Sequence, residues 1–379
     1  IAEAACDAIT TGKGGTITIN GGDVTAHGGI DNFEHQSLDM LSGNGIGPYF
    51  DGTVTINGGH VKAFADGKGC GIGGHRGEVT VTITGGTVEA VAANQFAAIG
   101  GEGSVTITGG VINAAGKNNA AGIGSNGDIR ITGGEITVSA EGLGAAIGGY
   151  AGVDCGNITI QGNVIKSVIS SGAGACIGGA SNRSAGSITI SNAKLPPLNG
   201  TSLIGWIRGN TAGSLTIRNC YIESTDTAAG SGIQVSDNGN IRIENSEVKL
   251  PEKRDIRAGD GGSIVIRDST IHSNGIYMLG NLNEAKNLKR LEITGSTVVT
   301  AGNVIGAMGS RASVDEIVIH GSSLSPAEGA DHYYAIGGGE YASFGSIDIQ
   351  GSQINIPLAS NGAAIGGGNY ATYSGESTI

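Results

Sequence analysis

One short motif recurs along the whole sequence. The motif, Thr-Ile-Thr-Gly-Gly, is intact at Thr82–Gly86 and at Thr106–Gly110. Its central isoleucine returns after 23 to 30 residues in every interval except one of 37 residues. It occupies Ile19, Ile56, Ile83, Ile107, Ile131, Ile160, Ile190, Ile217, Ile243, Ile266, Ile293, Ile319 and Ile349. A period of this length predicts a solenoid in which each repeat forms one coil.

Three further patterns define the strands of a coil. The residue two positions before the motif isoleucine is always Ile, Val or Leu, and so is the residue five positions after it. Apolar residues that alternate with polar ones are typical of a β-strand. A third apolar position lies in the sequence Ala/Gly-Ile-Gly-Gly, for example at Ile72 and Ile147. We therefore expect three short strands per coil and no substantial helix.

A single coil cannot bury its apolar face, so each strand must pair with its equivalent in the next coil, about 4.8 Å away. This predicts an all-β, single-stranded, right-handed parallel β-helix of about thirteen coils. We expect one domain over residues 1–379, with a loop insertion at about residues 29–45. Both ends fall inside repeats, so we expect a fragment of a longer solenoid whose uncapped ends allow self-association.

Composition narrows the choice of partners. The formal net charge is −12 and no run of Lys or Arg occurs, so we expect no nucleic-acid partner. No stretch is long and apolar enough to span a membrane. The five cysteines lack C-x-x-C spacing, and Cys176 aligns with Ala146 and Ala364 of other coils. We therefore expect Cys176 to be a small buried filler, and no disulfide framework.

The turn at residues 69–74, Gly-Cys-Gly-Ile-Gly-Gly, followed by Val-Thr-Ile-Thr-Gly-Gly-Thr-Val at residues 81–88, carries a family resemblance. It resembles the Gly-rich, pectate-lyase-like parallel β-helix repeats of bacterial cell-surface and secreted proteins. The resemblance implies an extracellular location and a carbohydrate-active or adhesin-like role. It brings no catalytic motif, and the same architecture serves lyases, glycoside hydrolases, adhesins and tailspikes.

A cluster of charged residues breaks the repeat in coils seven to ten. Asp237 and Asp260 occupy the same position in successive coils, with Arg208 one coil before them and Arg257 close by. These four are the candidate catalytic residues of a glycoside hydrolase or polysaccharide lyase, with the two aspartates as an acid/base pair. The alternative is a structural ladder of ion pairs, which Arg218, Glu244 and Arg267 also suggest.

Aromatic residues break the repeat near its end. Tyr341 and Phe344 align with Tyr370 and Tyr373 of the next coil. Stacked rings on an exposed turn would form a flat platform for sugar rings, or the rings would simply pack on one another. Trp206, which lies beside the charged cluster, and Tyr277 are further candidate glycan contacts. Tyr277, like Gln234 and Arg257, replaces a glycine that elsewhere leaves a bare strip.

No metal site or cofactor is predicted. The insertion holds His27, Asp31, Glu34, His35 and Asp39, and a metal site there, with calcium as one candidate ion, is the alternative to a solvated loop. Their spacing matches no metal signature, so the solvated loop is favoured. We therefore expect an extracellular, bacterial, carbohydrate-binding or adhesin-like β-helix that binds a polysaccharide or glycan. A polysaccharide-degrading enzyme and a purely structural stalk are the alternatives.

Overall fold

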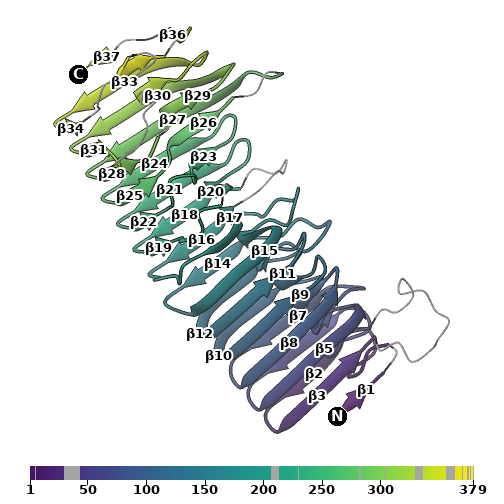
Figure 1. Ribbon diagram of the computed structural model, residues 1–379. Helices are drawn as coiled ribbons and strands as arrows, with labels where there is room; N and C mark the ends of the chain where they lie inside the picture. Colours follow the sequence, from purple (N-terminus) through teal and green to yellow (C-terminus); the bar gives the residue numbers. More distant parts are fainter. Residues whose placement is uncertain are drawn as a thin grey trace. The chain divides into compact units, whose positions relative to one another are not determined.

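The computed structural model describes residues 1–4, 6–29, 43–205, 213–228, 230–280, 283–302, 304–328, 336–355, 363–368, 370–373, 375 and 377–378. The chain divides into two compact units, Ile1–Gly209 and Asn210–Ile379. In the described part of each unit every regular element is a β-strand (Figure 1). No described segment is a helix long and apolar enough to cross a membrane. The predicted all-β fold is confirmed, with about 12 turns in all.

In unit 1 the motif isoleucines lie on stacked parallel strands. These strands are β2 (Gly15–Ile19), β4 (Gly52–Ile56), β7 (Val79–Ile83), the first part of β10 (Val105–Gly116) and of β12 (Ile129–Ala140), β14 (Ile158–Gln161) and β16 (Ile188–Ser191). Isoleucine pairs with isoleucine at each step, as in Ile56↔Ile83 and Ile131↔Ile160. The parallel stacking inferred from the period is therefore confirmed (Figure 1).

The other strands of unit 1 stack in the same way. The second strands are β3 (Asp23–Gly28), β5 (His60–Lys68), β8 (Thr87–Asn94), the later parts of β10 and β12, and β15 (Ile165–Gly178). The third strands are β6 (Ile72–Gly74), β9 (Ala97–Gly101), β11 (Ala121–Ser125), β13 (Ile147–Gly148), the end of β15, and β17 (Asn199–Gly205). The short strand β1 (Ala2–Glu3) pairs with β3. In β10 and β12 the first two strands of a coil run on through the Gly-Gly turn.

Unit 2 keeps three separate strands in most coils. The first strands are β18 (Leu215–Arg218), β21 (Asn240–Glu244), β24 (Ser263–Arg267), β27 (Lys286–Thr294), β30 (Ala312–His320), β33 (Ser343–Gln350) and β37 (Ser377–Thr378). The second strands are β19 (Tyr221–Glu223), β22 (Glu247–Lys249), β25 (Thr270–Ser273), β28 (Thr297–Thr300), β31 (Ser323–Pro326) and β34 (Gln353–Ile354). The third strands are β20 (Ser231–Gln234), β23 (Ile256–Ala258), β26 (Ile276–Leu279), β29 (Ile305–Met308), β32 (Ile336–Gly338) and β35 (Ile365–Gly367), and β36 (Thr372–Tyr373) pairs with β33.

Aliphatic columns form the core of each unit. Every motif isoleucine is buried, as is every apolar residue two positions before it. The column five positions after it is also buried, except at Val24 and Ile354. Each fully buried aliphatic side chain contributes about 1.5–3 kcal/mol. Cys176 is buried as expected, and all five cysteines are free thiols.

The turn after the motif isoleucine changes its geometry along the chain, and the sequence follows. In the first coils the second residue of Gly-Gly takes the positive φ, for example 88° at Gly86 and 94° at Gly110. In later coils the first residue of the turn takes it instead, with φ of 46° at Asn245 and 48° at Asp268. A φ near 50° is left-handed helical backbone that Asn and Asp tolerate, whereas a φ near 90° favours glycine. This is why Asn-Ser and Asp-Ser replace Gly-Gly.

A column of serines stabilises these turns in unit 2. Four of the five serine hydroxyls accept the backbone N–H of the equivalent serine one coil earlier, at 3.1 Å, and the hydroxyl of Ser246 accepts that of Cys220 at 3.0 Å. The same hydroxyl donates to the carbonyl two residues before it. The column consists of Ser246, Ser269, Ser296, Ser322 and Ser352. Backbone N–H groups at these turns of unit 2 are thereby satisfied.

The glycines after the third-strand isoleucine do not form a bare surface strip, so that expectation is wrong. Gly148 and Gly306 are buried, and their φ angles are 142° and 144°. A Cβ on Gly148 would collide with the carbonyl oxygen of Gly178, which stands opposite it in the next coil. The column is glycine because backbone packs on backbone, not because the surface is empty.

Candidate functional site

The two aspartates of the predicted catalytic cluster bind backbone groups of the following coil. The N–H of Asp260 donates to Asp237 Oδ1 at 2.8 Å, and the N–H of Asn287 donates to Asp260 Oδ1 at 2.6 Å. Lys286 Nζ lies 3.1 Å from Asp237 Oδ2. Short acidic side chains that accept turn N–H groups are a common structural device. Their acid/base role stays a prediction.

Of the two arginines of this cluster, the structure describes only Arg257. Arg208 lies outside the described residues, as does Trp206. Arg257 Nη2 donates to Ser231 Oγ at 2.7 Å and to Gln234 Oε1 at 3.1 Å. Among the described residues, Arg257 therefore binds neutral groups of the neighbouring coil and neither aspartate.

Tyr277 lies inside unit 2 instead of on its surface. Its side chain is 2% exposed, and its hydroxyl donates to Asp255 Oδ2 at 2.7 Å. Asn274 Nδ2 donates to the other oxygen of Asp255 at 2.9 Å. The expectation that Tyr277 contacts a glycan is wrong, because its side chain is buried and its hydroxyl binds a carboxylate of the preceding coil.

Beside this group lies the fully buried Arg254. Its Nη2 is 2.9 Å from Asp226 Oδ2, and its Nη1 donates to the carbonyl of Ser231 at 3.2 Å. A buried guanidinium requires a carboxylate partner, because desolvation of an uncompensated charge is costly. Polar residues in these coils thus replace part of the aliphatic core with an internal hydrogen-bonded network.

Ion pairs link the first strands of unit 2, in the region where Arg218, Glu244 and Arg267 suggested them. Arg218 Nη2 lies 2.7 Å from Glu244 Oε2, and Arg267 Nε lies 2.6 Å from Glu292 Oε1. Arg290 binds both Glu292, at 3.1 Å, and Glu316. The hydrogen bond from Arg267 is the main reason that the pKa of Glu292 lies below its usual value, and Arg290 acts in the same direction.

Replacement of Glu292 should reveal what this ladder contributes. We expect Glu292→Gln to lower the free energy of unfolding by about 1–2 kcal/mol at pH 7, because two arginines lose the nearly buried carboxylate that they share. A lowered pKa means that the contribution is complete above the unfolded-state pKa near 4.5 and is lost as the pH falls through the folded-state value. Urea denaturation of both proteins between pH 3 and pH 7 measures this.

The exposed pair Lys249–Glu247 supplies the control for that experiment. Glu247→Gln should change the free energy of unfolding by less than about 1 kcal/mol, because both partners are well solvated. An equal effect of the two substitutions, or a Glu292→Gln effect that grows toward pH 3, would contradict the assignment.

The predicted aromatic platform is present in part. Tyr341 and Tyr370 stack with ring centroids 4.9 Å apart and an interplanar angle of 3°. They are 51% and 75% exposed, and Tyr373 is 49% exposed. Phe344 is only 7% exposed, since it packs against Tyr373 at 5.0 Å and under the turn glycines. The prediction that Phe344 contacts a glycan is therefore wrong, whereas the three tyrosines present their rings to solvent.

The backbone beneath the stacked tyrosines is unusual. Both Tyr341 and Tyr370 have a φ of 60°, five residues after the third-strand isoleucine. Other coils fill this position with residues suited to left-handed backbone, such as Gly152, Asn182 and Gly261. A bulky residue at positive φ is rare, and such strain concentrates at functional sites. A tyrosine at this position therefore raises the conformational energy of the backbone relative to Gly or Asn.

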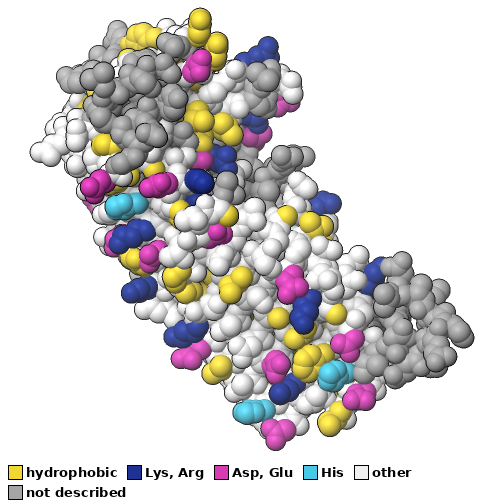
Figure 2. Space-filling model, viewed as in Figure 1, with side chains coloured by type: hydrophobic (Ala, Val, Ile, Leu, Met, Phe, Trp, Pro, Cys, Tyr) yellow, Lys and Arg dark blue, Asp and Glu magenta, His cyan; other side chains and the backbone are white. Residues whose placement is uncertain are grey.

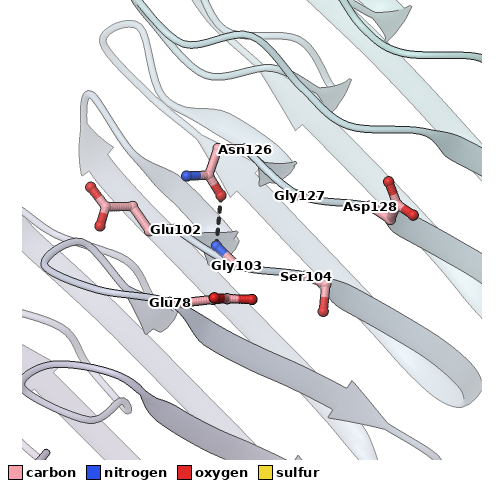
Figure 3. Close-up of a pocket in the computed structure, with 7 residues that line it drawn as sticks. All are labelled: Glu78, Glu102, Gly103, Ser104, Asn126, Gly127 and Asp128. Atoms are coloured by element: carbon pink, nitrogen blue, oxygen red, sulfur yellow. Dashed lines mark hydrogen bonds between the residues drawn. The ribbon is translucent and has the colours of Figure 1, made fainter.

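Sequence reasoning overlooked a groove in unit 1 (Figure 3). It encloses about 420 Å³ and is lined by Glu78, Glu102, Gly103, Ser104, Asn126, Gly127 and Asp128. Glu78, Glu102 and Asn126 each stand five residues before a motif isoleucine, so a column of acidic and amide residues at that position was the available signal. Asn126 Oδ1 accepts the N–H of Gly103 at 2.7 Å.

The carboxylates of this groove do not converge on one point. Figure 3 shows those of Glu78, Glu102 and Asp128 spread over three coils. Within the described ranges no three His, Cys, Asp or Glu residues are placed to hold a metal ion. The groove is acidic and shallow, and the residues of the insertion from Asp31 to Asp39 lie outside the described part of the chain.

A second polar cluster in unit 1 holds a neutral histidine. Arg76 Nε donates to His75 Nε2 at 3.1 Å, so His75 Nδ1 carries the proton and donates to Asn44 Oδ1 at 2.9 Å. Burial, and then the charge of Arg76, lower the pKa of His75 to about 4. The thiol of Cys70 beside it is buried, which raises its pKa to about 12. The cluster links coils and holds neither a charged imidazole nor a thiolate at neutral pH.

Charged side chains of both signs are scattered over the face shown in Figure 2, with no continuous field of Lys and Arg among the coloured side chains.

Stacked parallel strands with aliphatic columns define a β-solenoid. The family model described as right handed beta helix region matches residues 149–324, and the model described as beta helix repeat matches residues 17–47, 54–77, 81–104 and 105–128. The chain belongs to the right-handed parallel β-helix repeat proteins, as the resemblance implied. Neither a curated protein nor a solved structure matches it significantly.

Proposed function

We propose that this chain is an extracellular, carbohydrate-binding or adhesin-like β-helix of a bacterial surface or secreted protein. Its glycan contacts are Tyr341, Tyr370 and Tyr373. The observation that carries the proposal is the exposed tyrosine stack on left-handed backbone. Gly or Asn makes this turn in coils such as those of Gly152, Asn182 and Gly261, and Arg311 makes it with a φ of 58° in the coil before Tyr341. Neither tyrosine is therefore needed for the turn itself.

Tyrosine suits a sugar ligand in two ways. The C–H face of a pyranose packs on an aromatic ring, and the phenol hydroxyl hydrogen-bonds to sugar hydroxyls. Between the tyrosines, Ser343 Oγ and Thr372 Oγ1 lie 2.5 Å apart on the surface and add further hydroxyl groups. The stack is already ordered, so little side-chain entropy is lost on binding.

Replacement of the stacked rings tests the proposal. We expect the double variant Tyr341→Asn, Tyr370→Asn to bind its glycan at least tenfold more weakly, since one ring contact of about 1.4 kcal/mol corresponds to tenfold. Its stability should stay within about 1 kcal/mol of the parent, because relief of left-handed backbone strain offsets the lost stacking. A glycan array followed by isothermal titration measures the binding, and urea denaturation measures the stability.

Phe50→Ser is the control, because Phe50 is an exposed ring on unit 1 that the proposal does not use. Glycan binding should be unchanged in this variant. Glycan binding that survives loss of both stacked tyrosines would exclude them as contacts, and a large loss of stability would assign the stack a structural role.

Polysaccharide cleavage at Asp237 and Asp260 remains the alternative from a different class, and a purely structural stalk is the third. The turn contacts of both aspartates give cleavage no specific support. Release of reducing sugar or of an unsaturated product from a panel of polysaccharides would support cleavage as the function.

A further inference from the structure

Tyr341, Tyr370 and Tyr373, here called the tyrosine surface, lie in a stretch of chain whose Asp and Glu residues are not matched by any Lys or Arg. Between residues 312 and 379 the sequence holds seven Asp and Glu residues and no Lys or Arg. Like charges that surround a site repel an approaching anion, most strongly at low salt. Such repulsion acts on a glycan that carries carboxylate or sulfate groups.

One of these acids stands directly beside the stack. Glu340 immediately precedes Tyr341 and is exposed. Within the described residues its carboxylate forms no ion pair, in contrast to Glu316, which binds Arg290, and Asp348, which binds His320 at 2.9 Å. The charge of Glu340 is therefore the uncompensated charge nearest to the rings in sequence.

The nearest arginine along the chain is directed away from the rings. Arg311 stands one coil before Tyr341 in the same column, because Ser313 pairs with Ser343. Its Nη1 donates to the backbone carbonyl of Asn283, in the coil on the other side, at 3.2 Å. Arg311 thus binds the preceding coil, and its guanidinium group is not directed toward a ligand carboxylate at the tyrosine surface.

The polar groups between the rings are uncharged. Ser343 and Thr372 pair with each other through their hydroxyls at the surface, and each can rotate to donate to or accept from a ligand hydroxyl. Rings, hydroxyls and a neighbouring carboxylate suit a ligand that is rich in hydroxyls and has no negative charge.

We infer that the tyrosine surface selects neutral glycans and excludes those that carry carboxylate or sulfate groups. The inference rests on the proposed function, since it assigns the ligand class of the same surface. Repulsion from Glu340 and its neighbours should weaken binding of an acidic polymer about tenfold or more at low salt.

Matched polymers that share one backbone provide the test. Hydroxyethyl cellulose against carboxymethyl cellulose, and methyl-esterified against free polygalacturonate, differ mainly in charge. We expect the full chain to prefer the neutral member of whichever pair it binds, at least tenfold in 20 mM NaCl and less in 300 mM NaCl. Titration calorimetry and affinity electrophoresis at both salt concentrations measure this.

Two charge variants decide the cause. Glu340→Lys should narrow the preference at least threefold, whereas Arg311→Gln should leave neutral binding unchanged within about twofold. A preference for the acidic polymer, or loss of binding in Arg311→Gln, would overturn the selectivity while it leaves glycan binding intact. Absence of binding to every polymer and to a glycan array would instead overturn the proposed function, and the selectivity with it.

Discussion

Gly148→Ala is expected to destabilise unit 1 strongly, with a loss of at least about 4 kcal/mol in the free energy of unfolding. Gly148 has a φ of 142°, which L-residues rarely adopt. Its added Cβ would also collide with the carbonyl oxygen of Gly178 in the next coil. Backbone cannot move aside as a flexible side chain can, so β13 and β15 would have to separate. Urea denaturation followed by circular dichroism measures the loss.

Gly152→Asn is the matched control from the same turn. Gly152 also has a positive φ, 83°, but a Cβ there meets nothing within 4 Å. Asn182 occupies the equivalent position one coil later with a φ of 58°. We expect this variant to change stability by less than about 1 kcal/mol. Similar losses in both variants would show that conformational freedom, and not the contact between coils, explains the glycine column.

Ile266→Ala should cost about 2–5 kcal/mol, because it leaves a cavity in a continuous column of isoleucines. Ile266 is fully buried between Ile243 and Ile293, with which it pairs in register. Ile266→Val removes one methylene group and should cost only about 0.5–1.5 kcal/mol. Both values come from denaturant unfolding of purified variants.

Val265→Ala controls for strand propensity, because Val265 lies on the same strand with its side chain on the opposite, partly exposed face. We expect a change below about 1 kcal/mol there. If Ile266→Ala cost no more than Val265→Ala, the motif isoleucine would not be a core residue and the reason given for its recurrence would fail.

The sequence alone determined the fold, the strand positions and the core. A period shared by Ile56, Ile83 and Ile107 leaves few arrangements open, because residues at one position of a repeat must occupy one column of the solenoid. The small filler role of Cys176 and the pairing of Arg218 with Glu244 followed from the same alignment of coils. Whether residues 1–379 form one domain stays a prediction.

Only the tertiary structure decided which unusual residues face solvent. Tyr277 replaces a strand glycine and Tyr341 replaces a turn residue, yet Tyr277 is buried and Tyr341 is half exposed. The sequence does not reveal this difference, because the exposure of a side chain at an irregular position depends on the local φ and on contacts with the neighbouring coils. Asp237 and Asp260 likewise became turn acceptors once the N–H groups of the following coil were in place. Repetition encodes the scaffold, while exposure at its irregular positions depends on contacts between coils that no single repeat contains.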